Sequence, residues 1–287
     1  MNSQDKGLIY LYCLTNKIPK LSRPVIETKA GSRPLLDGMA GKEVENFANN
    51  IFSVYHEGLY AIVGKVKESE FSEENLKKNL ADLEWIKTKA AIHEKIIEWI
   101  MSYTCVIPFK FGTIFNTEDN LKTMLDEHKE EFKRNLMDLE GKEEWGVKIY
   151  AGIEKLKGSL SQEDKELLNI DKEINSASPG KAFLLKKKKE ELLNTVMNKK
   201  LNEYGQYSFE RLSQYAIEKR INKLLPKEVT ERNEEMILNS AFLIIKNEVE
   251  DFLNIVEALR TKYTDKGFFF DCTGPWPPYN FCEAIPA

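Results

Sequence analysis

The stretch IFSVYHEGLYAIVGKV, residues 51–66, decides the fold class of this chain. It contains two runs rich in β-branched and aromatic residues, 51–56 and 59–66, a composition that is typical of strands. Glu57 and Gly58 lie between the runs and suit the tight turn of a β-hairpin. The stretch therefore predicts an antiparallel pair of strands, around which the rest of the first half can be arranged.

Further elements flank this hairpin on both sides. Residues 8–14 (LIYLYCL) precede it as a predicted strand, and residues 42–48 are a short helical candidate. After the hairpin, a helical period begins near Ser72. The apolar face of this helix carries residues at spacings of three and four, namely Ile86, Ala90, His93, Ile97 and Ile100.

The first half of the chain closes with one more strand and one more helix. Residues 105–111 are predicted as a strand, and Pro108 within it favours an edge position or a bulge. An apolar stripe predicts a single helix over residues 117–139, which ends before Gly141. The order is that of a β-α-β-β-α-β, ferredoxin-like domain. We therefore expect an N-terminal ferredoxin-like α+β domain over residues 1–140.

The second half repeats this order around a long helical region. We predict strands over residues 145–151, 221–229, 236–246 and 267–272, and a helix over residues 248–260. Residues 154–219 are mostly helical and are broken at 176–180, so they form a hairpin that either projects into solvent or covers a sheet face. The predicted fold is thus α+β with two ferredoxin-like domains. The second domain, residues 141–287, carries the inserted helical hairpin and an ending rich in proline and aromatic residues.

Composition limits the classes of function. The chain has 287 residues, a length that suits two domains, and its net charge of −4 provides no basic field for nucleic acid. Its apolar runs are much shorter than the ~20 residues of a membrane span. Residues 8–14 are followed by no small-residue cleavage site, so we interpret them as a strand and expect a cytoplasmic protein.

The sequence contains no recognisable catalytic or metal-binding pattern. His93 and His128 lie in apolar helical stripes, where a histidine is more often part of the core. No nucleophile elbow, zinc-protease or dinucleotide motif is present, and residues 38–43 have the wrong glycine spacing for a phosphate loop. The lysine run 186–189 is followed directly by two glutamates, as on a solvated helix face. We expect no enzymatic activity, no cofactor and no metal.

Four cysteines are spread along the chain, and none lies in a C-x-x-C pair or beside a histidine at metal-ligand spacing. We interpret them as reduced, mostly buried thiols. A disulfide between Cys272 and Cys282 is the alternative that this spacing leaves open.

Four segments resemble a known family. They are CVIPFKFGTIF (105–115), EEWGVKIY (143–150), PGKAFLLKKKKEE (179–191) and GPWPPYNF (274–281). In this order and spacing they are similar to segments of the gas vesicle proteins of the GvpF/GvpL family. The residues that carry the similarity are Pro108, Phe111, Gly112 and Thr113 in the first segment, Glu144, Trp145, Val147 and Lys148 in the second, and Gly274, Pro275, Trp276, Pro277, Pro278, Tyr279 and Phe281 in the last.

This resemblance implies a two-domain α+β protein with an accessory or minor structural role in gas vesicle assembly. The implied partners are the small hydrophobic shell protein and other gas vesicle accessory proteins, without nucleic acid or membrane, and the implied location is cytoplasmic and associated with gas vesicles. Paired ferredoxin-like domains can also bind a small molecule between them, which leaves a ligand-sensing module as an alternative. The glycine-containing loop 31–41 is the feature that favours it.

The last segment raises a separate question of conformation. Proline fixes φ and lacks an N–H, so Pro275, Pro277 and Pro278 predict an extended, polyproline-like path. Trp276, Tyr279 and the nearby Phe281 would supply large contact areas along it. Two interpretations remain: the segment fastens onto this protein's own last sheet or domain interface, or it is a docking edge for another gas vesicle protein.

Overall fold

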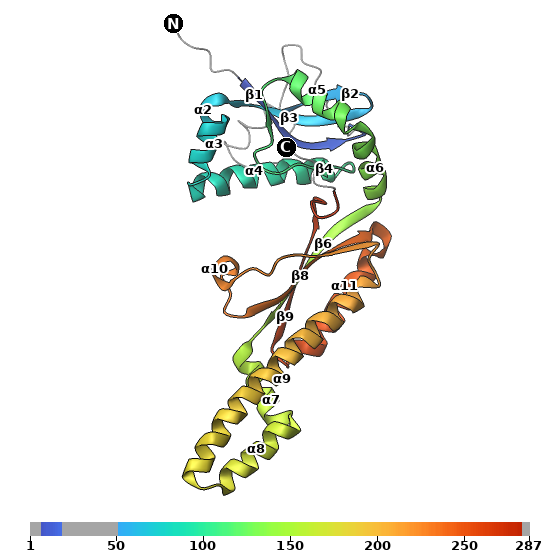
Figure 1. Cartoon of the computed structure of the whole chain (residues 1–287). Helices are drawn as coiled ribbons and strands as arrows, with labels where there is room; N and C mark the ends of the chain where they lie inside the picture. The colour runs from blue at the N-terminus through green and yellow to red at the C-terminus, as the bar shows by residue number, and fades with distance from the viewer. Residues whose placement is uncertain (1–6, 19–50, 283–287) are drawn as a thin grey trace. The chain divides into compact units, whose positions relative to one another are not determined.

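The structure, a computed structural model, describes residues 7–18 and 51–282. These form two compact units (Figure 1). Unit 1 contains the described residues up to Gly141 together with those from Trp276 onward, and unit 2 comprises Lys142–Pro275. The predicted helix 42–48 and the loops 31–41 and 38–43 lie outside the described residues. Each unit combines helices with an antiparallel sheet, so the mixed α+β class is confirmed.

The sheet of unit 1 has the order β2-β3-β1-β4, and β5 also pairs with β1. Its long strands are β1 (Gly7–Thr15), β2 (Ile51–His56) and β3 (Leu59–Lys67), and β1 and β2 both pair antiparallel with β3. The predicted hairpin is confirmed: its turn residues Glu57 and Gly58 both have positive φ, 50° and 87°. This conformation is the one that a two-residue hairpin turn needs.

The strand predicted over 105–111 is wrong in extent. Only β4 (Ile107–Pro108) is a strand there, and the chain turns before β5 (Ile114–Phe115). Gly112 makes this turn possible because its φ of +86° is a conformation that side chains disfavour. The segment is therefore a turn between two short strands rather than one edge strand.

Five helices of unit 1 lie in the described residues. They are α2 (Glu68–Phe71), α3 (Glu73–Asn79), α4 (Leu83–Met101), α5 (Glu118–Glu127) and α6 (Lys129–Leu139). The single helix predicted over 117–139 is wrong, because the chain leaves helical geometry at His128, which has φ −114° and ψ 13°. An apolar stripe continues through both pieces and therefore hides the break. α4 packs its isoleucines on one face of the sheet, and Figure 1 shows α5 on the other face.

The sheet of unit 2 has the order β7-β8-β6-β9. Its strands are β6 (Lys142–Ala151), β7 (Glu218–Ile221), β8 (Glu235–Ile245) and β9 (Phe268–Trp276). The strand predicted over 221–229 is wrong: β7 ends at Ile221, and the short helix α10 (Lys227–Thr230) follows Pro226. Proline suits the start of a helix and cannot donate to a strand ladder, which explains the difference.

The longer helices of unit 2 pack against its sheet and extend into a hairpin. They are α7 (Ile153–Glu163), α8 (Lys165–Ser176), α9 (Pro179–Ser213) and α11 (Val249–Thr264), the last entered through the 3₁₀ turn η1 (Lys246–Glu248). The core joins α11 and the second half of α9 to alternate residues of β6 and β8. The break predicted within 176–180 is confirmed, and Pro179 is the first residue of α9.

Candidate functional site

A buried histidine lies at the centre of a cluster of hydrogen bonds in unit 1. His93 lies on α4, and its Nδ1 atom is 3.0 Å from the hydroxyl oxygen of Tyr10 on β1. Its Nε2 atom is 3.0 Å from the backbone oxygen of Phe109 and 3.1 Å from the hydroxyl oxygen of Tyr279. We call this group, completed by Glu94, the His93 centre. Three of its contacts join residues that lie far apart in the sequence.

The donors and acceptors of the His93 centre fix the state of the imidazole. A carbonyl oxygen can only accept, so Nε2 carries the hydrogen that it shares between Phe109 and Tyr279. Nδ1 then accepts from the Tyr10 hydroxyl, whose oxygen accepts the Gly112 N–H at 3.0 Å. The Tyr279 hydroxyl donates to a carboxylate oxygen of Glu94 at 2.9 Å. Both imidazole nitrogens are therefore occupied by neighbours from the same unit.

The electrostatics agree with a neutral histidine. Burial lowers the pKa of His93 to about 4, so the imidazole is uncharged near neutral pH. Burial also raises the pKa of Glu94 and of the hydroxyl of Tyr10. The pKa of Tyr279 is raised by burial and by the Glu94 carboxylate beside it. A histidine with both nitrogens engaged has no lone pair left for a substrate, so this arrangement fastens elements together.

Aromatic rings surround the His93 centre. The ring of Tyr10 meets those of Phe71 and Phe111 edge-on, with centroids 5.7 and 6.2 Å apart. The hydroxyl of the adjacent Tyr12 is buried without a hydrogen-bond partner in the described part of the chain. A Cβ atom at Gly64 would lie 3.1 Å from that hydroxyl, so glycine leaves room for the ring there. The centre is thus enclosed by close packing.

The first family segment builds one wall of the His93 centre. Phe111 packs in the aromatic shell, and the Gly112 N–H bonds Tyr10. The buried hydroxyl of Thr113 donates to the Lys110 carbonyl at 2.8 Å and closes the turn. Pro108, in β4, is buried. The structure therefore places the Pro108–Thr113 segment against the histidine, although sequence reasoning singled out neither His93 nor Tyr10 as a site residue.

The last family segment meets the first at this point. Pro277 and Pro278 are buried, and Tyr279 reaches the histidine. The predicted extended path is wrong after Trp276, because the N–H of Tyr279 bonds the Pro277 carbonyl at 2.7 Å and that of Phe281 bonds the Pro278 carbonyl at 3.1 Å. These bonds fold the segment into successive turns. β9 runs through Trp276, beyond the end at residue 272 that the sequence predicts.

Trp276 differs from Pro277 and Pro278 after it, since 41% of its surface is exposed, whereas Gly274 and Pro275 before it are exposed as well. We expected this tryptophan to be fully buried if the segment only fastens the protein to itself. The anchor of the segment is instead the partly buried Tyr279, together with the two buried prolines before it.

The second family segment contacts the last one within unit 2. A Cβ atom at Gly274 would lie 2.9 Å from the Trp145 ring and 3.0 Å from the Glu144 carbonyl oxygen. Any other residue would therefore displace β6 or the ring. The indole N–H of Trp145 donates to Glu143 at 3.3 Å. Only glycine allows this close approach of Gly274 to β6.

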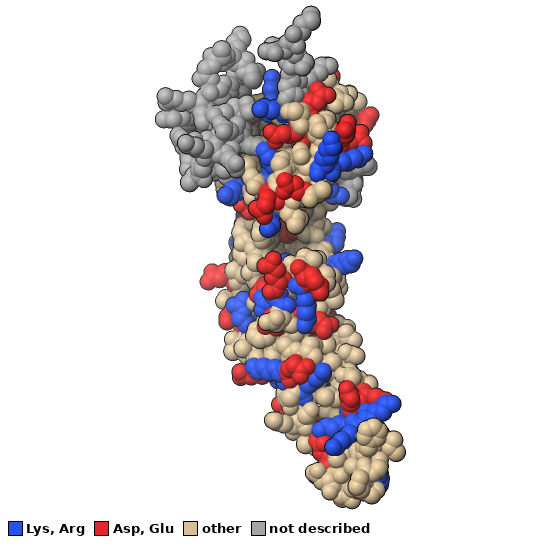
Figure 2. Space-filling model, turned by 90° about the vertical axis from the view of Figure 1, so that its left-hand side faces the viewer, with Lys and Arg blue, Asp and Glu red and all other residues tan. Residues whose placement is uncertain are grey.

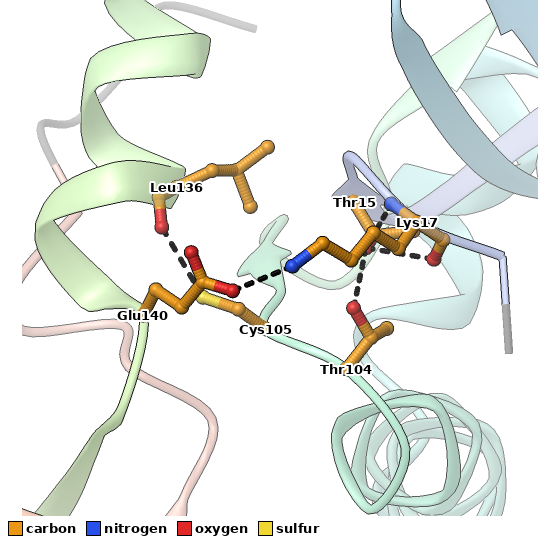
Figure 3. A network of polar contacts seen from close by, with 6 residues as sticks. All are labelled: Thr15, Lys17, Thr104, Cys105, Leu136 and Glu140. Carbon is orange, nitrogen blue, oxygen red and sulfur yellow. Dashed lines mark hydrogen bonds and ion pairs between the residues drawn. The ribbon is translucent and has the colours of Figure 1, made fainter.

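Figure 3 shows a further polar network, at the end of β1. The buried hydroxyl of Thr15 lies 3.1 Å from that of Thr104 and accepts the N–H of Lys17 at 3.2 Å. Lys17 also pairs with Glu140 across 2.6 Å, and the Cys105 thiol donates to a carbonyl of α6 at 3.7 Å. The network joins β1, the segment before β4 and the end of α6. It is a structural fastening like the His93 centre.

The third family segment is different, because it lies at an exposed helical end. Residues 179–191 begin α9, where Phe183 and Leu184 expose 71% and 67% of their surface. The lysines 186–188 beside them are also exposed. None of the polar centres described above includes this segment.

The described residues offer no group of three or more His, Cys, Asp or Glu side chains that could hold a metal ion. The helices within 7–18 and 51–282 are all too short or too polar to cross a membrane. None of the four cysteines, which all lie in the described residues, forms a disulfide, so the alternative pairing of Cys272 with Cys282 is not present.

Comparisons with known proteins identify the family of this chain. The family model described as gas vesicle synthesis protein GvpL/GvpF matches residues 8–283. Gas vesicle protein L of Streptomyces sp. (strain CB03234) is 24% identical over 226 residues, which cover 79% of this chain and 80% of that protein. Gas vesicle protein F of Haloferax mediterranei is 22% identical over 251 residues, 86% of each chain.

Solved structures show the same fold. The crystal structure of GvpF from Anabaena sp. PCC7120 matches with a TM-score of 0.68 at 18% identity, over 98% of this chain and 100% of that chain. The crystal structure of GvpF from Microcystis aeruginosa matches with a TM-score of 0.60 at 19% identity, over 97% and 100%. Because the family model spans nearly all of the sequence, this chain belongs to the gas vesicle synthesis protein GvpL/GvpF family.

Proposed function

We propose that this chain is a non-enzymatic accessory protein of gas vesicle assembly and that it binds the hydrophobic shell protein through Trp276. Family membership supports a role in gas vesicles. The observation that carries the rest is the exposure of Trp276 directly before the buried Pro277 and Pro278. The other residues of the last segment act as its support.

The ordered residues that follow Trp276 matter because binding costs conformational entropy. Pro277 and Pro278 are buried, and Tyr279 is bonded to Glu94 and His93, so the backbone after Trp276 is already ordered. A large aromatic side chain on an ordered backbone loses little further freedom when it binds. Tryptophan is also among the residues that most often dominate binding energy at interfaces. Trp276 therefore has the properties of a docking anchor.

The proposal of a non-enzymatic role rests on how the polar groups are used. The His93 centre contains the residue types of a catalytic site, but its imidazole nitrogens already bond Tyr10, Phe109 and Tyr279. A ligand-sensing role has its sequence support in the loop 31–41, which lies outside the described residues. No observation on the described residues favours that alternative, so we do not pursue it.

We also propose that two ferredoxin-like domains divide the sequence into residues 1–140 and 141–287, with the α8–α9 hairpin as an insertion in the second and with the residues from Trp276 onward grouped with unit 1. The support is topological: each sheet places its first strand between its third and its last. An experimentally determined structure that includes residues 19–50 tests this assignment. A connection other than a helix packed on the sheet would contradict it.

The binding proposal is tested with purified full-length protein and shell protein. Replacing Trp276 by Ala should weaken binding by about 30-fold, which corresponds to roughly 2 kcal/mol for an aromatic anchor. Tyr103→Ala is a matched control, because Tyr103 is an exposed aromatic of the same unit, with 54% of its surface exposed. Equal affinities of the Trp276 variant and the wild type would refute the anchor.

The same variant separates docking from fastening. A half-exposed tryptophan leaves a small cavity when truncated, so Trp276→Ala should destabilise the protein by about 1 kcal/mol, against the 3–5 kcal/mol of a fully buried one. At the level of the cell, deleting the gene should reduce the number of gas vesicles or change their shape. Normal vesicles in the deletion strain would contradict a role in assembly.

A further inference from the structure

We infer that the closed end of the α8–α9 hairpin is a second docking surface, which binds an acidic, amphipathic protein helix. We call this surface the hairpin end and define it as residues 174–189. The hairpin end contains five lysines and no Asp or Glu, although the whole chain has a net charge of −4. It thus has a local excess of positive charge on an acidic protein, bordered by Glu173 on one side and by Glu190 and Glu191 on the other.

The lysines of the hairpin end are mostly available. Lys189 is engaged, since its Nζ atom lies 2.7 Å from both carboxylate oxygens of Asp171 on α8. In the part of the chain that the structure describes, the remaining four form no ion pair with any residue, and they are exposed. These four are Lys181, Lys186, Lys187 and Lys188.

Large apolar side chains lie among these lysines. Phe183 and Leu184 are exposed, whereas Ala182, Leu185 and Lys189 are partly buried. Since the Lys189 bond to Asp171 marks the side of α9 that faces α8, the exposed pair lies on the outer side. In the face that Figure 2 shows, charges of both signs alternate over most of the surface, and the hairpin end at the bottom is mainly uncharged surface.

The geometry of the hairpin end is set before any partner arrives. Pro179 starts α9, and the N–H of Ala182 bonds the Ser178 carbonyl at 2.8 Å, as in a regular first turn. The bond between Lys189 and Asp171 joins the two helices two turns later. The apolar pair is therefore presented on an ordered helix, which lowers the cost of binding.

These features select the chemistry of the partner. Phosphate groups alone would leave Phe183 and Leu184 in water, which disfavours nucleic acid. Two large apolar side chains bury too little area for stable insertion into a bilayer, since even one fatty acyl chain binds only marginally. An amphipathic protein helix with an apolar stripe bordered by carboxylates satisfies both the pair and the lysines. Such a helix would lie across the outer side of α9.

The test uses the full-length protein and two synthetic helical peptides. Both carry the same leucine stripe, which is bordered by glutamates in one peptide and by lysines in the other. We expect the glutamate peptide to bind, with an affinity that falls as salt rises, and the lysine peptide not to bind. Equal binding of the two peptides, or of neither, would overturn the inference.

Variants locate the contact. The double variant F183D/L184D should weaken binding of the glutamate peptide by about tenfold or more. The triple variant K186E/K187E/K188E should reverse the preference, so that the lysine peptide binds better. The matched control is I221D/V229D, which changes exposed apolar residues elsewhere in unit 2. Unchanged binding by the hairpin variants, or loss of binding in the control alone, would overturn the location.

Two more measurements distinguish this inference from two alternatives, a membrane partner and the shell protein. Vesicles containing an anionic phospholipid should not bind the protein. Vesicle binding that is lost in F183D/L184D would instead identify a membrane, not a protein helix, as the partner of the hairpin end. Binding of the shell protein should be unaffected by the hairpin variants and sensitive to Trp276→Ala. Shell-protein binding that is weakened both by the hairpin variants and by Trp276→Ala would show that the two surfaces bind the same partner, which contradicts this inference.

Discussion

The His93 centre and the hairpin end use polar side chains in opposite ways. In the first, the imidazole bonds Tyr10, Phe109 and Tyr279, and the surrounding rings exclude water. In the second, four lysines surround two exposed apolar residues and pair with no described residue. In the first region the protein's own residues satisfy the polar groups. In the second, only a bound partner would pair the lysines and cover the apolar residues. Substitutions should therefore affect stability in one region and binding in the other.

The largest effect on stability is expected at the centre of the closed region. His93→Leu keeps the approximate volume but leaves the Tyr10 O–H without an acceptor and removes the imidazole donor to the Phe109 carbonyl in a buried site. Each unsatisfied group costs about 1–3 kcal/mol, so we expect a loss of about 4 kcal/mol in the free energy of unfolding, measured by urea titration. Lys95→Leu, on the exposed side of the same helix, should change it by less than about 0.5 kcal/mol. Similar losses in both variants would contradict the fastening role.

The next effect concerns pH. Unfolded His93 binds a proton near pH 6.5, whereas the folded protein binds it only near pH 4. Between these values the unfolded state holds more protons, so stability is complete above pH 6.5 and is lost as the pH falls toward 4. The loss should be about 3 kcal/mol, since a tenfold change in proton affinity is worth about 1.4 kcal/mol.

The titration of other groups in the His93 centre must be distinguished from that of His93. Glu94 has a raised pKa, so it acts in the opposite direction and stabilises the fold as the pH falls. The raised pKa values of Tyr10 and Tyr279 act only at alkaline pH. The quantity to measure is therefore the difference in unfolding free energy between the wild type and His93→Leu. A difference that stays constant from pH 7 to pH 4 would show that His93 is not buried neutral.

A smaller effect is expected where the last segment meets the His93 centre. Tyr279→Phe keeps the ring and removes the hydroxyl that donates to Glu94, so we expect a loss of about 1–2 kcal/mol. The matched control is Tyr103→Phe, which removes a hydroxyl from an exposed ring of the same unit and should have almost no effect. Thermal melting of both variants makes the comparison. Equal melting temperatures would mean that the prolines alone hold the segment.

The smallest effect on stability is expected at the hairpin end. Phe183→Ser removes an aromatic side chain that is mostly in water, so the unfolding free energy should change by less than about 0.5 kcal/mol. Leu212→Ser on the same helix is the contrasting variant, because Leu212 is fully buried in unit 2. A large loss in Phe183→Ser would mean that this side chain is packed rather than offered to a partner.

The sequence by itself determined the elements that depend on local chemistry. The hairpin at 51–66 follows from two runs rich in β-branched and aromatic residues around Glu57 and Gly58, whose conformation the turn requires. The helix break between α8 and α9 follows from Ser178 and Pro179, because proline is suited to the first turn of a helix. The strand β8 and the helix α11 also lie where periodicity predicts them. All of these signals act between residues a few positions apart.

Tertiary structure decided the points at which distant segments meet. His93 and Tyr279 are 186 positions apart, and no spacing rule relates them, so the sequence alone gave His93 only a place in an apolar stripe. Whether Trp276 is buried could not be predicted from the sequence for the same reason, since burial depends on what packs against a side chain. Proline chemistry predicted an extended path after Trp276, but the chain turns where Pro277 and Pro278 are buried, and local hydrogen bonds close these turns. Local propensity is a weak preference of a few tenths to about 1 kcal/mol per residue, and packing between distant segments overrides it.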